Sequence, residues 1–177
     1  MKIQKIETFS RQFLAFVRVT AADGTWGWGQ VAPYNADISA QIVHRQIAPW
    51  SLGEDAYDIE ALVKVIPEKE YKFPGSYLRR ALAGVETALW DRWGRADGKS
   101  VCELLGGRFG DDFVLYRAIS QESPAEMARK IAAYREEGYR RFQLKVGGNP
   151  DEDIQRIHEA RAVLEPAAKL VADANTG

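Results

Sequence analysis

The chain has 177 residues, of which 46% are hydrophobic and 28% are charged, proportions typical of a soluble globular protein. Its 24 basic and 25 acidic side chains leave a formal net charge of −1, which argues against a nucleic-acid binder, since that function requires a basic face. No apolar run approaches the ~20 residues that span a bilayer, and the N-terminus lacks the long apolar region of a secretory signal. We therefore expect a cytoplasmic protein that binds neither nucleic acid nor membranes.

Cysteine and histidine offer little chemistry in this sequence. The single Cys102 cannot form an internal disulfide, and with only two histidines there is no zinc-binding constellation. Cys102 is expected to be a small buried side chain within a short helix.

Three segments near the N-terminus alternate apolar and polar side chains and are predicted as antiparallel strands: residues 2–9, 13–20 and 25–31. The Asp-Gly pair at residues 23–24 is a tight-turn signal that joins the last two strands into a hairpin. Gly27 and Gly29 in the third strand suggest a bulge or a close backbone approach. Trp26 and Trp28 share one face of this strand, and we expect both to pack into the core.

Apolar side chains at helical spacing then predict three helices: residues 38–47, 55–65 and 77–93. Pro49, Pro67 and Gly94 are expected to end them. A fourth, short helix begins at a capping box, in which Ser100 caps the amide of Glu103 and the Glu103 side chain returns to the amide of Ser100.

From residue 111 on, strands and helices alternate. The predicted strands are residues 113–118, 142–146 and 169–172. Ser123-Pro124 and Asn149-Pro150 are strong helix starts, with a polar cap followed by proline in the first turn. Strand–helix alternation with short connections is typical of a parallel sheet. We therefore expect two domains, an α+β domain over residues 1–110 and a βα domain over residues 111–177.

Two charged residues stand at the ends of otherwise apolar strands. Lys145 ends the second βα strand and Asp173 ends the third, and parallel sheets collect their active groups at such carboxyl ends. From position alone an equally good interpretation is that Lys145 extends to solvent and Asp173 caps a turn. A phosphate-binding loop at residues 147–150 is not expected, because the glycine spacing is wrong and proline removes an amide donor.

Three motifs in order resemble one family. Residues 81–91 (ALAGVETALWD) with residues 104–107 (LLGG) resemble the end of the capping domain in the enolase superfamily, mandelate racemase/muconate lactonizing enzyme branch. Residues 142–147 (FQLKVG) resemble its KxK strand, and residues 173–175 (DAN) its DxN strand. The resemblance covers essentially the whole chain. It implies an α+β capping domain followed by the first three βα strands of a modified TIM barrel.

The resemblance also implies a chemistry. Such enzymes bind Mg²⁺ and remove the proton α to the carboxylate of a small substrate. That proton is very weakly acidic, so a Lys or His base acts together with metal-held carboxylate oxygens to stabilise the enediolate. By resemblance Lys145 is the base, Asp173 is the first metal ligand, and Asn175 supports metal or substrate. A homo-oligomer is expected as well.

Gln143 stands where the branch has the first lysine of KxK. Its amide can hydrogen-bond a carboxylate but cannot neutralise one, and we count it with Lys145 among the catalytic candidates. Without that second cation Lys145 is expected to stay closer to its ordinary pKa. One base on this side is enough to start a dehydration, so we expect dehydration of a hydroxy or sugar acid. Racemisation, epimerisation or cycloisomerisation is the alternative.

Substrate capping is expected from two loops of the first domain. The connector between the first two strands, at residues 10–12, is short where many relatives carry a mobile lid. Tyr34 and Phe73, in loops at residues 33–37 and 72–75, are therefore the capping candidates.

The length of the chain sets a further expectation. A TIM barrel needs roughly 250 residues, whereas the 67 residues that follow residue 110 supply three of its eight strands. The other two metal carboxylates and the opposing acid or base are expected outside this chain, which alone should be inactive. The rival hypothesis is a non-catalytic, truncated α+β product.

Overall fold

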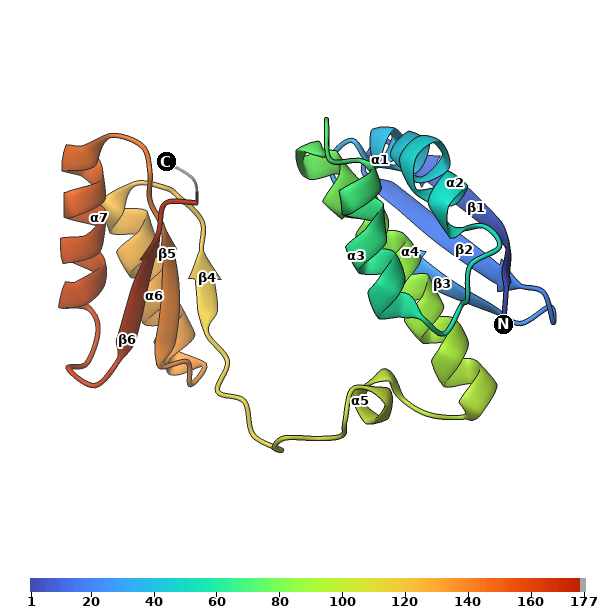
Figure 1. Ribbon diagram of the computed structural model, residues 1–177. Coiled ribbons are helices and arrows are strands. Elements are labelled where there is room, and N and C mark those ends of the chain that lie inside the picture. Colours follow the sequence, from blue (N-terminus) through green and yellow to red (C-terminus); the bar gives the residue numbers. More distant parts are fainter. Residues whose placement is uncertain (176–177) are drawn as a thin grey trace. The chain divides into compact units, whose positions relative to one another are not determined.

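The computed structural model describes residues 1–175 and divides the chain into two compact units, the first Met1–Phe109 and the second beginning at Gly110 (Figure 1). Thr176 and Gly177, the last two residues of the second predicted domain, lie outside the described residues.

The first unit is built on a three-stranded antiparallel sheet in the order β1-β2-β3. Its strands are β1 (Ile3–Arg11), β2 (Leu14–Ala21) and β3 (Trp26–Gln30). The three predicted strands are therefore confirmed, and the connector between β1 and β2 is the short turn at residues 12–13. A buried apolar side chain at every second position of β2 anchors one face of this sheet in the core.

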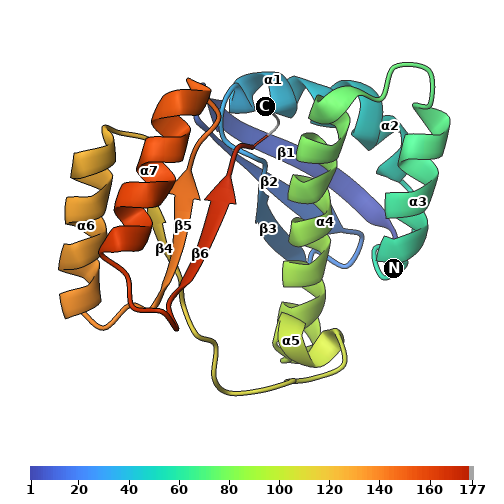
Figure 2. The same cartoon turned by 90° about the vertical axis from the view of Figure 1, so that its left-hand side faces the viewer.

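Helices cover the inner face of the sheet. They are α1 (Ala36–Ile42), a π-helical turn η1 (Val43–Ile47), α2 (Ala48–Ser51), α3 (Ile59–Lys69), α4 (Gly75–Asp97) and α5 (Val101–Leu104). The long α4 packs on β2 and β3, as Figure 2 shows from the side. Apolar side chains of α4, among them Leu78, Val85 and Leu89, meet Val17 and Val19 of the sheet in one continuous core.

The strand β3 lies against α4 through its glycines. A Cβ added at Gly27 would lie 2.2 Å from the carbonyl oxygen of Ala88, and one at Gly29 would lie 2.0 Å from that of Gly84. The close backbone approach suggested by the sequence is thus confirmed. Because the glycine face is the buried one, the neighbouring tryptophans take the other face, and the prediction that both pack into the core was wrong: Trp26 is 41% exposed.

The predicted helix ends at Pro49, Pro67 and Gly94 were also wrong. Pro49 lies in the first turn of α2, where a missing amide proton costs nothing, and α3 continues past Pro67 to Lys69. Gly94 lies inside α4, where a Cβ would meet the Lys99 carbonyl oxygen at 2.6 Å. The helix ends instead at Gly98, whose φ of 63° is left-handed.

The short helix α5 begins as predicted. The amide of Ser100 donates to Oε2 of Glu103 at 2.8 Å, and the amide of Glu103 donates to Oγ of Ser100 at 3.2 Å, so the capping box is confirmed. Cys102 is exposed rather than buried, because the one-turn helix presents it away from the core of its unit.

The second unit is a three-stranded parallel sheet in the order β4-β5-β6, with two helices on one face (Figures 1 and 2). Its elements are β4 (Arg117–Ile119), α6 (Pro124–Glu136), β5 (Arg141–Lys145), α7 (Pro150–Ala162) and β6 (Lys169–Asp173). Phe142 and Leu144 of β5 are buried with Met127 and Ile131 of α6 and with Ala160 of α7. The strand–helix alternation and both proline-led helix starts are confirmed.

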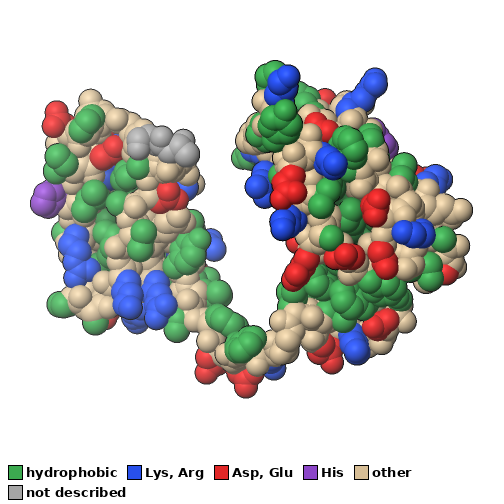
Figure 3. Space-filling model, in the orientation of Figure 1, with side chains coloured by type: hydrophobic (Ala, Val, Ile, Leu, Met, Phe, Trp, Pro, Cys, Tyr) green, Lys and Arg blue, Asp and Glu red, His purple; other side chains and the backbone are tan. Residues whose placement is uncertain are grey.

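The first predicted strand of this unit forms only over its last part. Arg117 pairs with Phe142, and β5 begins at Arg141, so residues 113–116 extend past the strand that would pair with them in the described part of the chain. Their side chains are exposed, with Phe113 at 81%. Hydrophobic side chains accordingly gather at the surface over the start of the second unit (Figure 3).

The glycine contact in the first unit gives a stability prediction. Gly29→Ala should destabilise the first unit by about 3 kcal/mol, because the new methyl group meets helix backbone that cannot move aside as a side chain can. All five tryptophans lie at or before residue 93, so tryptophan fluorescence during urea unfolding of the whole chain reports this unit. Gln30→Ala, an exposed change on the same strand, is the control and should stay within about 0.5 kcal/mol. Equal midpoints for the two variants would contradict the close approach.

Candidate active site

The alternation of β5 places its polar side chains on one face of the sheet. Phe142 and Leu144 turn toward the helices, so Gln143 and Lys145 take the opposite face. The parallel register pairs Lys145 with Asp173 at the carboxyl ends of β5 and β6. The fold therefore brings the two charged strand ends of the sequence analysis side by side.

Hydrogen bonds join four predicted site residues into one cluster. Nζ of Lys145 donates to Oδ2 of Asp173 at 2.6 Å and to Oδ1 of Asn175 at 2.7 Å. The Nε2 amide of Gln143 donates to the same Oδ2 of Asp173. The backbone amide of Asn175 donates to Oδ1 of Asp173 at 2.8 Å, which closes a turn with Asn175 at a φ of 54°. Asn tolerates this left-handed conformation better than most residues.

The electrostatics keep Asp173 ionised. The hydrogen bond from Lys145 lowers the pKa of the Asp173 carboxyl, and the backbone amide of Asn175 lowers that pKa further. The Lys145 and Asp173 side chains are 33% and 25% exposed, so the pair is accessible to a small molecule from the open face of the sheet. The pair places an amine and a carboxylate side by side at accessible strand ends, where the amine can transfer a proton and the carboxylate can bind a cation.

The oxygens of Asp173 and Asn175 are the kind of ligand that Mg²⁺ prefers. Among residues 1–175, no group of three or more His, Cys, Asp or Glu side chains could hold a metal ion. The described residues therefore fit one part of a magnesium site, with one carboxylate and one amide oxygen. Mg²⁺ at substrate sites often takes only one or two protein carboxylates.

Tyr34 and Phe73 belong to the first unit. Tyr34 is 66% exposed and meets Phe13 edge to face at 6.2 Å. Phe73 is 81% exposed, in the connection between α3 and α4. Their part in capping a substrate stays a prediction.

The sequence analysis did not single out two residues of α7 that act on the loop after Lys145. Asp153 accepts the amides of Gly147 and Gly148 at 3.0 and 2.9 Å, and Arg156 donates to Asp153 at 2.7 Å. The glycine amides that a phosphate loop would use are thus engaged by a side chain. The spacing of three between an Asp and an Arg was a signal for the pair, though not for its contact with the loop.

An α+β unit followed by parallel βα strands, with a lysine facing a carboxylate at the strand ends, defines a class of two-domain βα-barrel proteins. The chain belongs to the mandelate racemase/muconate lactonizing enzyme family: residues 3–106 match its N-terminal domain model, and residues 126–177 match the enolase C-terminal domain-like model. The fold predicted for both parts of the chain is confirmed.

The relatives include two dehydratases. The chain is 46% identical over 167 residues to cis-3-hydroxy-L-proline dehydratase of Roseibium aggregatum, a match that covers 91% of the chain and 44% of the relative. It is 30% identical over 171 residues to D-galactonate dehydratase of Xanthomonas axonopodis pv. citri, with 96% and 44% covered. The chain thus spans less than half the length of these relatives.

A solved structure supports the same architecture. The mandelate racemase/muconate lactonizing protein from Paracoccus denitrificans PD1222, complexed with magnesium, superimposes with a TM-score of 0.83 at 32% identity. The match covers 99% of this chain and 52% of that one. Among the described residues, no helix has the length and apolar character needed to cross a membrane.

The Lys145–Asp173 pair gives a pH prediction. Since Asp173 has a lowered pKa, its ionised form stabilises the fold above its unfolded pKa, and this stabilisation is lost as the pH falls through the lower folded value. In Lys145→Met the pKa of Asp173 should rise toward its ordinary value, as measured by a carbon-13 NMR titration of the carboxyl group. Lys169→Met, at the exposed start of β6, is the control and should leave that pKa in place. An unchanged titration in Lys145→Met would contradict the pairing.

Proposed function

We propose that this chain supplies the base and the first metal-binding carboxylate of a Mg²⁺-dependent dehydratase for small hydroxy carboxylic acids. The observation that carries the proposal is the contact of Lys145 with Asp173 at the ends of two parallel strands. The names of the two dehydratase relatives support the reaction class. Since the chain spans less than half of those relatives, the activity belongs to the protein at their length.

Lys145 is the proposed base. As a free amine it removes the proton α to the substrate carboxylate and becomes an ammonium. That ammonium returns the proton to the β-hydroxyl, the carbon–oxygen bond breaks, and water leaves as a double bond forms between the α and β carbons. The product is the enol of a 2-keto acid where the α carbon carries a hydroxyl group, and an enamine where it carries nitrogen, as in 3-hydroxyproline. A single group can thus serve as base and then as acid, whereas racemisation requires a second acid on the opposite face of the substrate. This is why the proposal favours dehydration.

Asp173 and Asn175 are the proposed metal-binding residues of the site. They would hold Mg²⁺ through a carboxylate and an amide oxygen, and the ion would stabilise the enediolate charge at the substrate carboxylate. Gln143 donates a hydrogen bond from a neutral amide to Oδ2 of Asp173, so it orients the carboxylate without adding a cation beside Lys145. A homo-oligomer and a cytoplasmic location stay predictions.

The base is tested by removing the amine. In the protein at full length, Lys145→Ala should lower dehydration of cis-3-hydroxy-L-proline or D-galactonate by about 10²–10⁴-fold. Proton NMR in D₂O follows both product formation and exchange of the α-proton. Lys169→Ala is the matched control. Lys169 is exposed at the start of β6, the end of the strand opposite to Asp173, and its removal should keep full activity. Wild-type exchange in Lys145→Ala would overturn the role of the base.

Exchange without loss of hydroxyl, in the wild-type protein, would instead indicate a racemase or epimerase. That outcome keeps Lys145 as the base but rejects dehydration.

The metal ligand is tested by removing one charge. Asp173→Asn keeps the shape of the side chain, and in the full-length protein it should abolish both Mg²⁺ binding and turnover, because an amide binds Mg²⁺ far more weakly than a carboxylate. Isothermal titration calorimetry measures the binding. Asp151→Asn, an exposed change in the first turn of α7, should leave both unchanged. The 177-residue chain should bind Mg²⁺ no better than a surface carboxylate does, and tight binding by it would contradict a shared site.

A further inference from the structure

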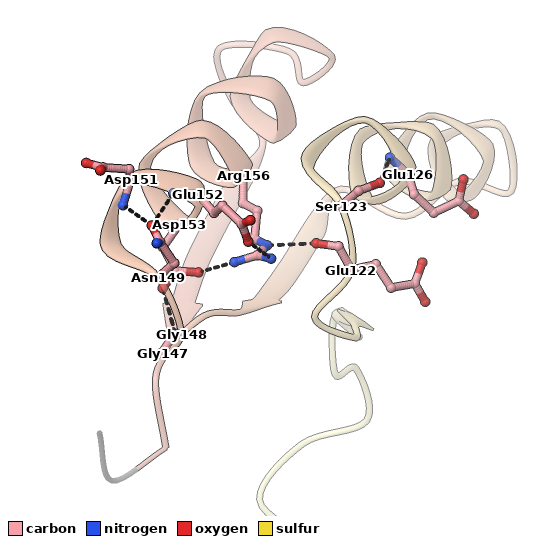
Figure 4. Close-up of polar contacts among 10 residues, drawn as sticks. All are labelled: Glu122, Ser123, Glu126, Gly147, Gly148, Asn149, Asp151, Glu152, Asp153 and Arg156. Carbon is pink, nitrogen blue, oxygen red and sulfur yellow. Dashed lines mark hydrogen bonds and ion pairs between the residues drawn. The ribbon is translucent and has the colours of Figure 1, made fainter.

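The loop that follows Lys145 is held by a side chain of the next helix. In Figure 4, Asp153 of α7 points back at residues 147–148, and its Oδ2 accepts the amide of Gly147 at 3.0 Å and the amide of Gly148 at 2.9 Å. These amides begin two residues after the proposed base. Val146 lies between Lys145 and these glycines, and its amide donates to the carbonyl oxygen of Asp173 at 3.0 Å.

Arg156 links Asp153 to the loop that follows β4. Its Nη1 donates to Oδ1 of Asp153 at 2.7 Å, and its Nε donates to the backbone carbonyl oxygen of Glu122, in the loop after β4, at 2.7 Å (Figure 4). Its Nη2 donates to Glu152 at 2.7 Å. The Arg156 side chain is only 8% exposed and that of Asp153 only 15%, so solvent screens this pair less than a surface ion pair.

The held loop touches the backbone beside the proposed metal ligand. Gly147 has a φ of 105°, and a Cβ added there would lie 3.2 Å from the carbonyl oxygen of Ala174. Ala174 is the residue between Asp173 and Asn175. The glycine loop is therefore linked to both strands of the site. It follows Lys145 of β5 in the chain, and it lies close to Ala174, which follows β6.

Capping of α7 does not require Asp153. Asn149 already caps this helix, since its Oδ1 accepts the amides of Asp151 at 2.9 Å and Glu152 at 3.2 Å. Asp153 turns away from the helix amides and toward the loop. The hydrogen bonds from Gly148 and Arg156 lower the pKa of Asp153, so the carboxylate is charged when it accepts them.

We propose that Asp153 and Arg156 are positioning residues that fix the loop after β5 and thereby the placement of Lys145 against Asp173. This proposal rests on the proposed function for its effect on catalysis, but its effect on geometry can be measured without activity.

Two substitutions keep size while breaking the contact. Asp153→Asn removes one acceptor oxygen, so the side chain cannot serve both the glycine amides and Arg156. Arg156→Lys keeps the charge but lacks the planar fork that reaches three acceptors. Arg161→Lys is the matched control: Arg161 lies on the same helix and donates to the carbonyl oxygen of Glu165 at 2.9 Å, at the end remote from the loop.

The first measurement uses NMR on the 177-residue chain with lysine and glycine labels. In Asp153→Asn and Arg156→Lys, the amides of residues 147–148 should exchange with solvent at least tenfold faster, and the Lys145 side-chain resonances should shift. Both should stay unchanged in Arg161→Lys. Unshifted Lys145 resonances in both variants would overturn the proposal, whatever the activity of the protein.

The second measurement uses steady-state kinetics of the full-length protein, at a temperature where circular dichroism shows each variant fully folded. Arg156→Lys should lower kcat by about 10–100-fold with KM within about twofold, as for other residues that orient a catalytic group. A purely structural role predicts a lower melting temperature with wild-type kcat, and that result would overturn the proposal. An inactive wild type would reject the proposed function while leaving the NMR result to decide on the positioning role.

Discussion

Register between β5 and β6 is the constraint on which the site depends. Lys145 faces Asp173 because the two residues are paired in a parallel ladder, and a slip of one residue would turn one of them toward the helices. Burial of Phe142 and Leu144 against α6 and α7 prevents that slip, since both would have to enter solvent. The buried apolar side chains of β5 therefore determine the position of Lys145 on the opposite face.

The face of the sheet that carries this pair is also its open face. Beside the site, Tyr116, Gln143 and Val171 line a hollow of about 340 Å³, and Val171 is 60% exposed. Parallel sheets are normally covered on both faces, and α6 and α7 cover only one here. The Lys145–Asp173 pair thus lies on the face of this sheet that α6 and α7 leave uncovered.

Local signals in the sequence predicted the order of the elements and the site pair, whereas contacts between distant segments decided the failures. Lys145 and Asp173 were predictable because a charged residue that ends an apolar strand is a local signal. Trp26 was placed wrongly in the core because the sequence does not show that α4 takes the glycine face of β3. Gly94 was taken as a helix end, although its lack of a side chain serves the approach of Lys99. Asp153 escaped notice because acidic residues in the first turn of a helix already have a local explanation in the helix dipole.

Glycine has a cost that the second unit has to offset. Gly147 allows the close approach to Ala174, but glycine loses more conformational freedom on folding than any other residue. Without a further contact, a Gly-Gly loop would leave the amine of Lys145, the proposed base, poorly fixed. The carboxylate of Asp153 removes that freedom by accepting both amides, and Arg156 fixes the carboxylate in turn from a nearly buried position. The close approach to Ala174 thus comes from the glycine loop, whereas the hydrogen bonds that hold this loop in place come from the helix α7 that follows it.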